Sequence, residues 1–164
     1  MARILIVGGG CRGRRLASEM ARDGHALRVT TRTEDHRAAI EATGAECWIG
    51  TPDRLATMRA ALDSVTIACW MLGTATGEAE RVRALHTARL ELFLTQTIDT
   101  TVRGFIYEAA GSTVPREVLA EGERIGRAMG ARNAIPVAVL TADPSDAQAW
   151  LKDARAAIGG LLGG

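Results

Sequence analysis

The chain has 164 residues, of which 47% are hydrophobic, so it can bury one continuous core as a single domain. Twenty basic and nineteen acidic residues give a formal net charge of +1, which excludes a global field that would attract nucleic acid or a membrane surface. The three cysteines form no CxxC pair and have no histidine at metal spacing, and no apolar run approaches the roughly 20 residues that span a bilayer. Without a secretory signal, a soluble cytoplasmic protein with no metal site is expected.

Short apolar runs rich in branched residues alternate with amphipathic patterns along the whole chain. In chain order we expect a strand at 4–7, a helix at 14–22, a strand at 26–31, a helix at 34–42, a strand at 46–49, a helix at 54–62, a strand at 65–69, a helix at 78–97, a strand at 102–107, a helix at 116–129, a strand at 134–140 and a helix at 145–158. This alternation predicts a three-layer, doubly wound α/β fold of Rossmann type, with about six parallel strands and right-handed crossovers. One such domain accounts for residues 1–160, leaving a flexible tail at 159–164 and no separate substrate domain.

The first strand ends in the glycine-rich stretch GGGCRG. Gly8, Gly10 and Gly13 fit the pattern G-x-G-x-x-G between a strand and a helix, which is the context that dinucleotide binding requires. Gly8 would allow the tight turn, Gly10 would let a pyrophosphate approach the backbone, and Gly13 would let the helix pack closely on the strand. The helix N-terminus favours an anion, and Arg12 and Arg14 would add positive charge. The alternative is a glycine-rich turn without a ligand.

The second strand ends in Thr31 and Arg32, where an acidic residue would bind a ribose 2′-hydroxyl and an arginine would accept a 2′-phosphate. A guanidinium can bond two phosphate oxygens, so these residues favour NADP over NAD, with Arg37 as a second contact. In the alternative interpretation, Arg32 is a solvated loop residue.

Other residues near the expected carboxyl edge of the sheet are weaker candidates. Cys11 follows the glycines beside arginines, where a redox-sensitive thiol is found in some proteins, although a small residue facing the cofactor is the simpler interpretation. Trp70 could form a wall of the ligand cleft, and Gly73 in the next loop could approach the ribose or nicotinamide. The helix at 78–97 carries enough apolar surface for a homodimer, but burial against the sheet explains it equally simply.

Several segments together resemble the atypical and extended short-chain dehydrogenases and their nitrogen-repression-regulator-like relatives. These are ILIVGGGCRGRRLASEMARDGHALRVTTR, GTPDRLATMRAALDSVTIACWMLG, RGFIYEAAGS and NAIPVAVLTADPSD, which extend from Ile4 to about Asp146. The resemblance implies an NAD(P)-binding Rossmann domain, here a truncated one. It also places Thr51 where the family's aspartate contacts the adenine side.

The resemblance fails at the residues that catalyse carbonyl reduction in that family. Its Tyr-x-x-x-Lys motif is absent: the single tyrosine, Tyr107, lies in an expected strand and the single lysine is Lys152. Glu108 occupies a position of the family's paired serines, with Ser112 nearby, and these two are the remaining candidates for acid or base chemistry. Glu108 is equally well explained as a structural acceptor for a neighbouring arginine.

Two functions therefore stay open. One is an atypical NADP-dependent oxidoreductase in which Glu108, Ser112 or water handles the proton. The other is a non-catalytic sensor of NADP or NADPH, which is favoured by the missing acid and the missing substrate domain.

Overall fold

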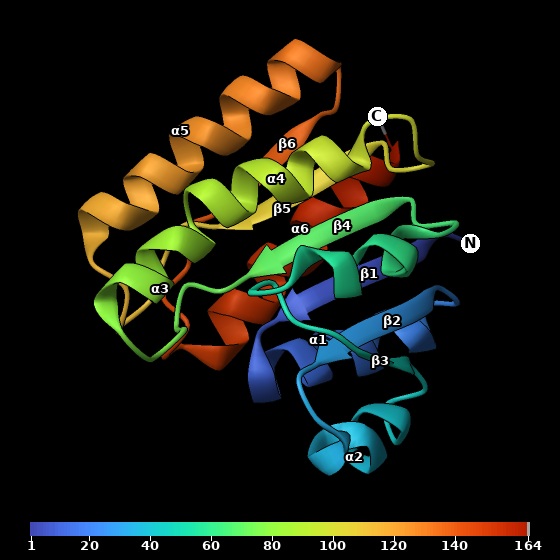
Figure 1. Cartoon of the computed structure of the whole chain (residues 1–164). Coiled ribbons are helices and arrows are strands. Elements are labelled where there is room, and N and C mark those ends of the chain that lie inside the picture. Colours follow the sequence, from blue (N-terminus) through green and yellow to red (C-terminus); the bar gives the residue numbers. More distant parts are fainter. Residues whose placement is uncertain (164) are drawn as a thin grey trace.

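The computed structural model describes residues 1–163 and shows one six-stranded parallel sheet between two layers of helices (Figure 1). The strands are β1 (Arg3–Gly8), β2 (Ala26–Thr31), β3 (Glu46–Ile49), β4 (Ile67–Met71), β5 (Gly104–Glu108) and β6 (Val137–Leu140). The helices are α1 (Gly10–Arg22), α2 (Arg37–Glu41), α3 (Ala79–Leu85), α4 (Ala88–Thr97), α5 (Arg116–Asn133) and α6 (Ala147–Gly163), with 3-10 turns at Glu34–His36, Leu55–Thr57 and Arg59–Leu62. The spatial order β3-β2-β1-β4-β5-β6 is that of a doubly wound Rossmann sheet, so the predicted fold class is confirmed.

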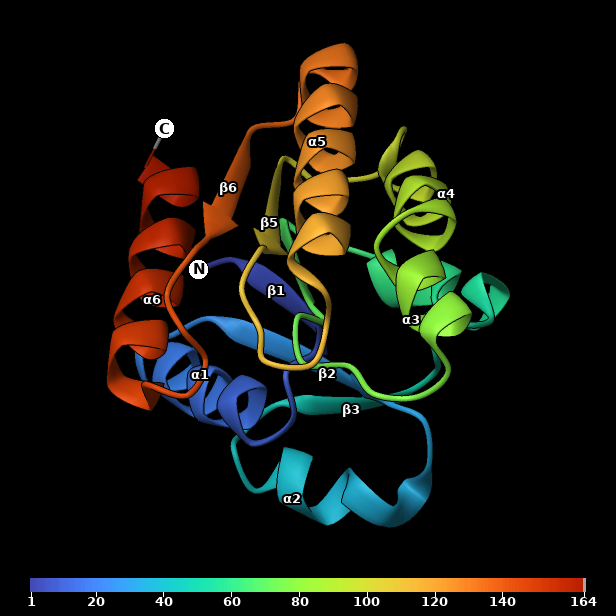
Figure 2. The ribbon, with the colours of Figure 1, turned by 90° about the vertical axis from the view of Figure 1, so that its left-hand side faces the viewer.

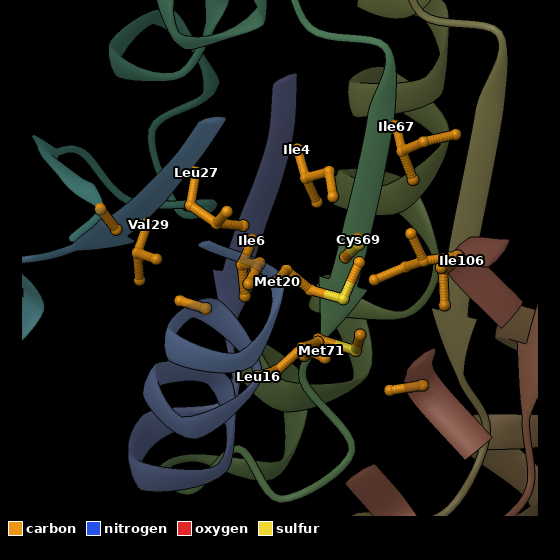
Figure 3. Close-up of a cluster of buried hydrophobic side chains, with 14 of the residues drawn as sticks. Ile4, Ile6, Leu16, Met20, Leu27, Val29, Ile67, Cys69, Met71 and Ile106 are labelled. Carbon is orange, nitrogen blue, oxygen red and sulfur yellow. The ribbon is translucent and has the colours of Figure 1, made fainter. Parts of the chain in front are cut away.

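Alternation along the strands builds one apolar cluster on each face of the sheet. In β1, Ile4 and Ile6 face α1 and α6, whereas Leu5 and Val7 face α4, α5 and the 3-10 turns. Figure 2 shows α1 and α6 on one side of the sheet and α3, α4 and α5 on the other. Figure 3 shows the first cluster, in which side chains of β1, β2, β4 and β5 meet Leu16 and Met20 of α1. The sheet is thus buried on both faces, as its continuous apolar runs predict.

Three glycines of α5, one every fourth residue, face β5 and β6. Gly122, Gly126 and Gly130 are all buried. A Cβ on Gly122 would overlap the phenol of Tyr107, and a Cβ on Gly130 would overlap a methyl carbon of Val137, whereas a Cβ on Gly126 would make an ordinary contact of 4.0 Å with Phe105.

The expected helix at 78–97 is wrong as a single element, because the chain leaves helical geometry at His86 (φ −104°, ψ 0°) and Thr87. Both ring nitrogens of His86 bond to buried groups, Nδ1 to the Tyr107 hydroxyl at 2.7 Å and Nε2 to the Leu72 carbonyl at 3.0 Å. These contacts anchor the junction between α3 and α4 to the sheet.

Two other predicted segments differ in detail. The expected helix at 54–62 consists of two 3-10 turns, because side chains compete for its carbonyls: the Thr57 hydroxyl donates to Arg54 O at 2.6 Å and Trp48 Nε1 donates to Thr57 O at 2.8 Å. At the C-terminus, the expected frayed segment is helical as far as Gly163, and Leu161 and Leu162 pack against the core. Residue 164 of that expected tail lies outside the described residues.

Candidate functional site

The glycine loop joins β1 to α1 at the carboxyl edge of the sheet, and two of its glycines are required by close packing. Gly8 has a left-handed φ of +81°, and a Cβ there would lie 2.6 Å from the carbonyl oxygen of Met71. A Cβ on Gly13 would lie 2.8 Å from the carbonyl oxygen of Gly8. These positions therefore have the geometry expected for the turn off the strand and for the close approach of α1.

Gly10 differs, because it has a left-handed φ of +53° and nothing lies within 4 Å of where its Cβ would be. It is the first residue of α1, and the N-cap residue Gly9 has no side chain to bond the free N–H groups of the first turn. The backbone here is open to an anionic group, and the helix dipole favours negative charge. A pyrophosphate fits this position.

A cleft of about 530 Å³ lies beside this loop, between β1, β2, the loop after β3 and the loop after β4. Six of the predicted cofactor residues line it: Gly8, Gly10, Cys11, Arg14, Thr31 and Arg32. Cys11 is exposed, and Arg14 Nη2 lies 3.1 Å from its sulfur. The structure therefore brings together the glycine loop and the end of β2, as the sequence predicts.

Asp53 does not itself line the cleft, but it lies between the guanidinium groups of two residues that do, Arg32 and Arg81. Arg32 donates a hydrogen bond to Asp53 Oδ2, and Arg81 of α3 bonds both carboxylate oxygens at 3.0 to 3.1 Å. Thr51 is not a lining residue; its hydroxyl donates to Asp53 Oδ2 at 3.2 Å and so helps to position the carboxylate. Sequence reasoning missed Asp53 and Arg81, because they are 28 residues apart and only the folded chain joins them.

Arg37, the expected second contact for a 2′-phosphate, is bound elsewhere. It forms ion pairs with Glu34 and Glu41 along its own helical segment. The hydrogen bonds from the Arg37 guanidinium lower the pKa of the Glu34 carboxyl. Arg37 does not line the cleft.

Arg12 also points away from the cleft, toward the carboxyl end of β5. Its Nη2 lies 3.2 Å from Glu108 Oε2 and 3.2 Å from the Thr74 hydroxyl, and its guanidinium lies 5.2 Å from the centre of the Trp150 ring. The expectation that Arg12 faces the phosphates therefore does not match this geometry. The buried Glu108 carboxylate attracts it instead.

Glu108 is completely buried, and its carboxylate accepts bonds from three elements of the fold. Gly73 N donates to Oε1 at 2.7 Å, and Trp150 Nε1 donates to Oε2 at 2.6 Å, in addition to the Arg12 contact. These partners belong to α1, the loop after β4 and α6. The carboxylate has the environment of a structural acceptor that ties these elements together.

The remaining candidates lie outside the cleft. Trp70 is fully buried on the other face of the sheet, where its ring is 4.7 Å from that of Phe93 and its Nε1 donates to Leu85 O. Gly73 is buried, and Ser112 is exposed on the loop after β5. His86 is fully buried below the loop after β4, and burial lowers its pKa to about 4.

Comparison with solved structures places this geometry among Rossmann folds. Vestitone reductase from alfalfa has a TM-score of 0.67 at 15% identity, covering 85% of this chain and 56% of that one. A short-chain dehydrogenase/reductase superfamily protein from Agrobacterium tumefaciens, solved with bound NAD, has a TM-score of 0.69 at 16% identity over 84% of this chain and 48% of that one. AtPrR2, solved with NADP⁺ and (+)pinoresinol, has a TM-score of 0.61 at 19% identity over 86% and 50%.

These similarities establish the fold, and the chain spans about half the length of the structures it matches. No family model matches the chain, and no curated protein matches it significantly. Within residues 1–163, no helix has the length and apolarity to cross a bilayer, and no group of three histidine, cysteine or acidic side chains is arranged to hold a metal ion.

Proposed function

We propose that this chain binds a nicotinamide dinucleotide through the cleft, with the pyrophosphate at Gly10 and the adenosine extending toward Arg32. The observation that carries the proposal is the open space at Gly10, at an uncapped helix N-terminus that lines the cleft. Backbone N–H groups and the helix dipole would bind the phosphates without a charged side chain.

NADP(H) is the favoured form, with NAD as the alternative. The Arg32 side chain is 55% exposed at the rim of the cleft, and Arg81 lies on the other side of Asp53. Two guanidinium groups share one carboxylate, so this end of the cleft keeps an excess positive charge. A 2′-phosphate would meet that charge, and a guanidinium can bond two of its oxygens.

Of the two functions that the sequence leaves open, the geometry supports the non-catalytic binding module over the atypical oxidoreductase. Glu108 is buried against Gly73 N, Trp150 Nε1 and Arg12, so no face of its carboxylate is open to a substrate. Ser112 is an exposed loop residue outside the cleft. The module would respond to NADP or NADPH and act through a partner, in the cytoplasm.

The homodimer through α3 and α4 stays a prediction. Leu90, Phe93 and Leu94 of α4 are buried against the sheet, which accounts for most of the apolar surface of that helix. Leu92 is 52% exposed and would be the centre of such an interface.

The test is calorimetric titration of the chain with NADP⁺, NADPH, NAD⁺ and NADH, together with a turnover assay on aldehydes and quinones. We expect binding without turnover, and a loss of NADP⁺ affinity of about 10-fold in Arg32→Ala with NAD⁺ affinity kept. Arg103→Ala is the matched control, because this exposed arginine precedes β5 at the opposite edge of the sheet. Failure of all four nucleotides to bind would refute the proposal, and turnover would restore the oxidoreductase.

A further inference from the structure

The cleft occupies only one half of the ligand-binding edge of the sheet. A doubly wound sheet binds a dinucleotide across its switch point, here between β1 and β4, with one nucleotide on each half. The lining residues come from β1, β2, the loop after β3, the loop after β4, and the segments around α1, α2 and α3. Within residues 1–163, none comes from β5 or from any element after it. The cleft therefore covers the half that holds the adenosine side of a dinucleotide.

The other half is closed by direct contact between two loops. Gly73, after β4, and Gly111, after β5, touch through their backbones: a Cβ on Gly111 would overlap the carbonyl oxygen of Gly73, and a Cβ on Gly73 would overlap that of Ala110. The Thr113 hydroxyl adds a hydrogen bond of 2.9 Å to Ala75 O. No side chain fits between these loops, and a nucleoside is much larger than a side chain.

Beneath these loops, the space is filled by side chains. Glu108 and Trp150 are almost completely buried and bonded to one another at 2.6 Å, and Arg12 lies against both. Opening the region for a ligand would break this pairing and leave a buried charge without a partner, which is strongly unfavourable. The second half of the edge is thus occupied by the protein itself.

We infer that the site recognises only the adenosine diphosphate part of its ligand, with the 2′-phosphate, and leaves the second nucleoside in water. This inference rests on the proposed function and narrows it. The ligand class becomes adenosine 5′-diphosphate compounds that carry a 2′-phosphate, and oxidised and reduced forms bind alike. The chain would then respond to the total amount of phosphorylated cofactor and not to its redox state.

One other hollow could receive the second nucleoside if this inference were wrong. It has a volume of about 330 Å³, shares Ala75 and Thr76 with the cleft, and reaches Pro115 and Val118 at the start of α5. If a dinucleotide crossed the loop after β4 at Ala75 and Thr76, its nicotinamide half would contact this hollow and would add to the affinity.

The test is calorimetric titration with NADP⁺, NADPH, the same molecule without its nicotinamide (2′-phospho-ADP-ribose), and nicotinamide mononucleotide. We expect the first three to bind within about 3-fold of one another and the mononucleotide not to compete. The emission of the reduced nicotinamide ring of NADPH should stay that of the free molecule in water. Saturation-transfer NMR on NADP⁺ should show transfer to the adenine protons and none to the nicotinamide protons.

The outcomes separate the two proposals. If NADP⁺ binds at least about 10-fold more tightly than 2′-phospho-ADP-ribose, or NADP⁺ and NADPH differ by that factor, the inference is overturned and the proposed function stands. Transfer of saturation to the nicotinamide ring would overturn it equally. If none of these nucleotides binds, the inference fails, and if NAD⁺ and NADH also fail to bind, the proposed function fails with it.

Discussion

Asp53→Asn is expected to increase the affinity for NADP⁺. The carboxylate is bonded to Arg32 and to Arg81, which line the cleft where we propose that the adenosine binds, and it would repel a 2′-phosphate brought to the same guanidinium. Asparagine keeps the size of the side chain and one oxygen that can accept these hydrogen bonds. The substitution therefore removes the charge and changes little else.

The size of the effect follows from Coulomb's law. A phosphate of charge about −2, roughly 5 Å from the carboxylate, is disfavoured by about 1.7 kcal/mol at the dielectric constant of water, and screening at physiological salt reduces this to about 1 kcal/mol. Asp53 is only 29% exposed, so its surroundings screen less well than water and the true repulsion is larger. We expect NADP⁺ to bind about 5- to 30-fold more tightly to the variant, which corresponds to about 1–2 kcal/mol.

The assay is calorimetry with NADP⁺ and NAD⁺ at low and at high salt. NAD⁺ lacks the 2′-phosphate, so its affinity should change by less than about 3-fold, and the gain for NADP⁺ should shrink near 1 M salt, where the Debye length is about 3 Å. Asp63→Asn is the control, because this exposed aspartate precedes β4 at the opposite edge of the sheet. Equal changes for both nucleotides, or weaker binding of NADP⁺, would refute the placement of the 2′-phosphate.

Three further predictions concern buried and exposed groups of the same fold. Glu108→Ala should reduce the free energy of unfolding by about 3–5 kcal/mol in urea denaturation, because it leaves the largely buried Arg12 guanidinium without its partner. A loss below about 1 kcal/mol would contradict the structural role of the Glu108 carboxylate. Burial lowers the pKa of His86 to about 4 from its usual 6.5, so the unfolded chain binds more protons between these values and stability should fall as the pH drops from 6.5 toward 4. Between pH 6.5 and pH 5 the loss should be about 1.5 kcal/mol, absent in His86→Gln but kept in the exposed control His36→Gln. Alkylation of the native chain, followed by mass spectrometry, should modify the exposed Cys11 and spare Cys69, because Cys69 is fully buried and burial raises its pKa to about 12. Saturating NADP⁺ should slow the reaction of Cys11, which lines the cleft, and an unchanged rate would place the ligand elsewhere.

Local patterns were sufficient to predict the sheet. Each strand is a short apolar run bounded by glycine, proline or charged residues, and the alternation with helices implies parallel pairing. The wrong predictions, the helices at 78–97 and 54–62, lie where the structure depends on contacts with other elements. The break at His86 depends on bonds to Tyr107 and Leu72, and the 3-10 turns after β3 depend on donors from Trp48 and Thr57, which no helical pattern can reveal.

Some residues of the candidate site could be placed from the local sequence, and others only from the complete fold. The placement of Gly8, Gly10 and Arg32 at one cleft was predictable, because it follows from their positions in one βαβ unit. Arg12 and Glu108 are 96 residues apart, so their pairing depends on the complete sheet. Trp70 was placed at the end of a strand expected to stop at Cys69. The strand continues to Met71, so alternation turns the indole to the face covered by α4.

The glycines of α5 have a consequence for how the chain reaches its native state. Each glycine lowers the helix propensity of a segment by about 1 kcal/mol relative to alanine, so three in one helix leave α5 poorly able to form in isolation. Two of these glycines, Gly122 and Gly130, are what allow it to approach Tyr107 and Val137. We therefore expect the segment Arg116–Asn133 to become helical only once β5 is in place, and to be among the first segments to open when that strand is disturbed.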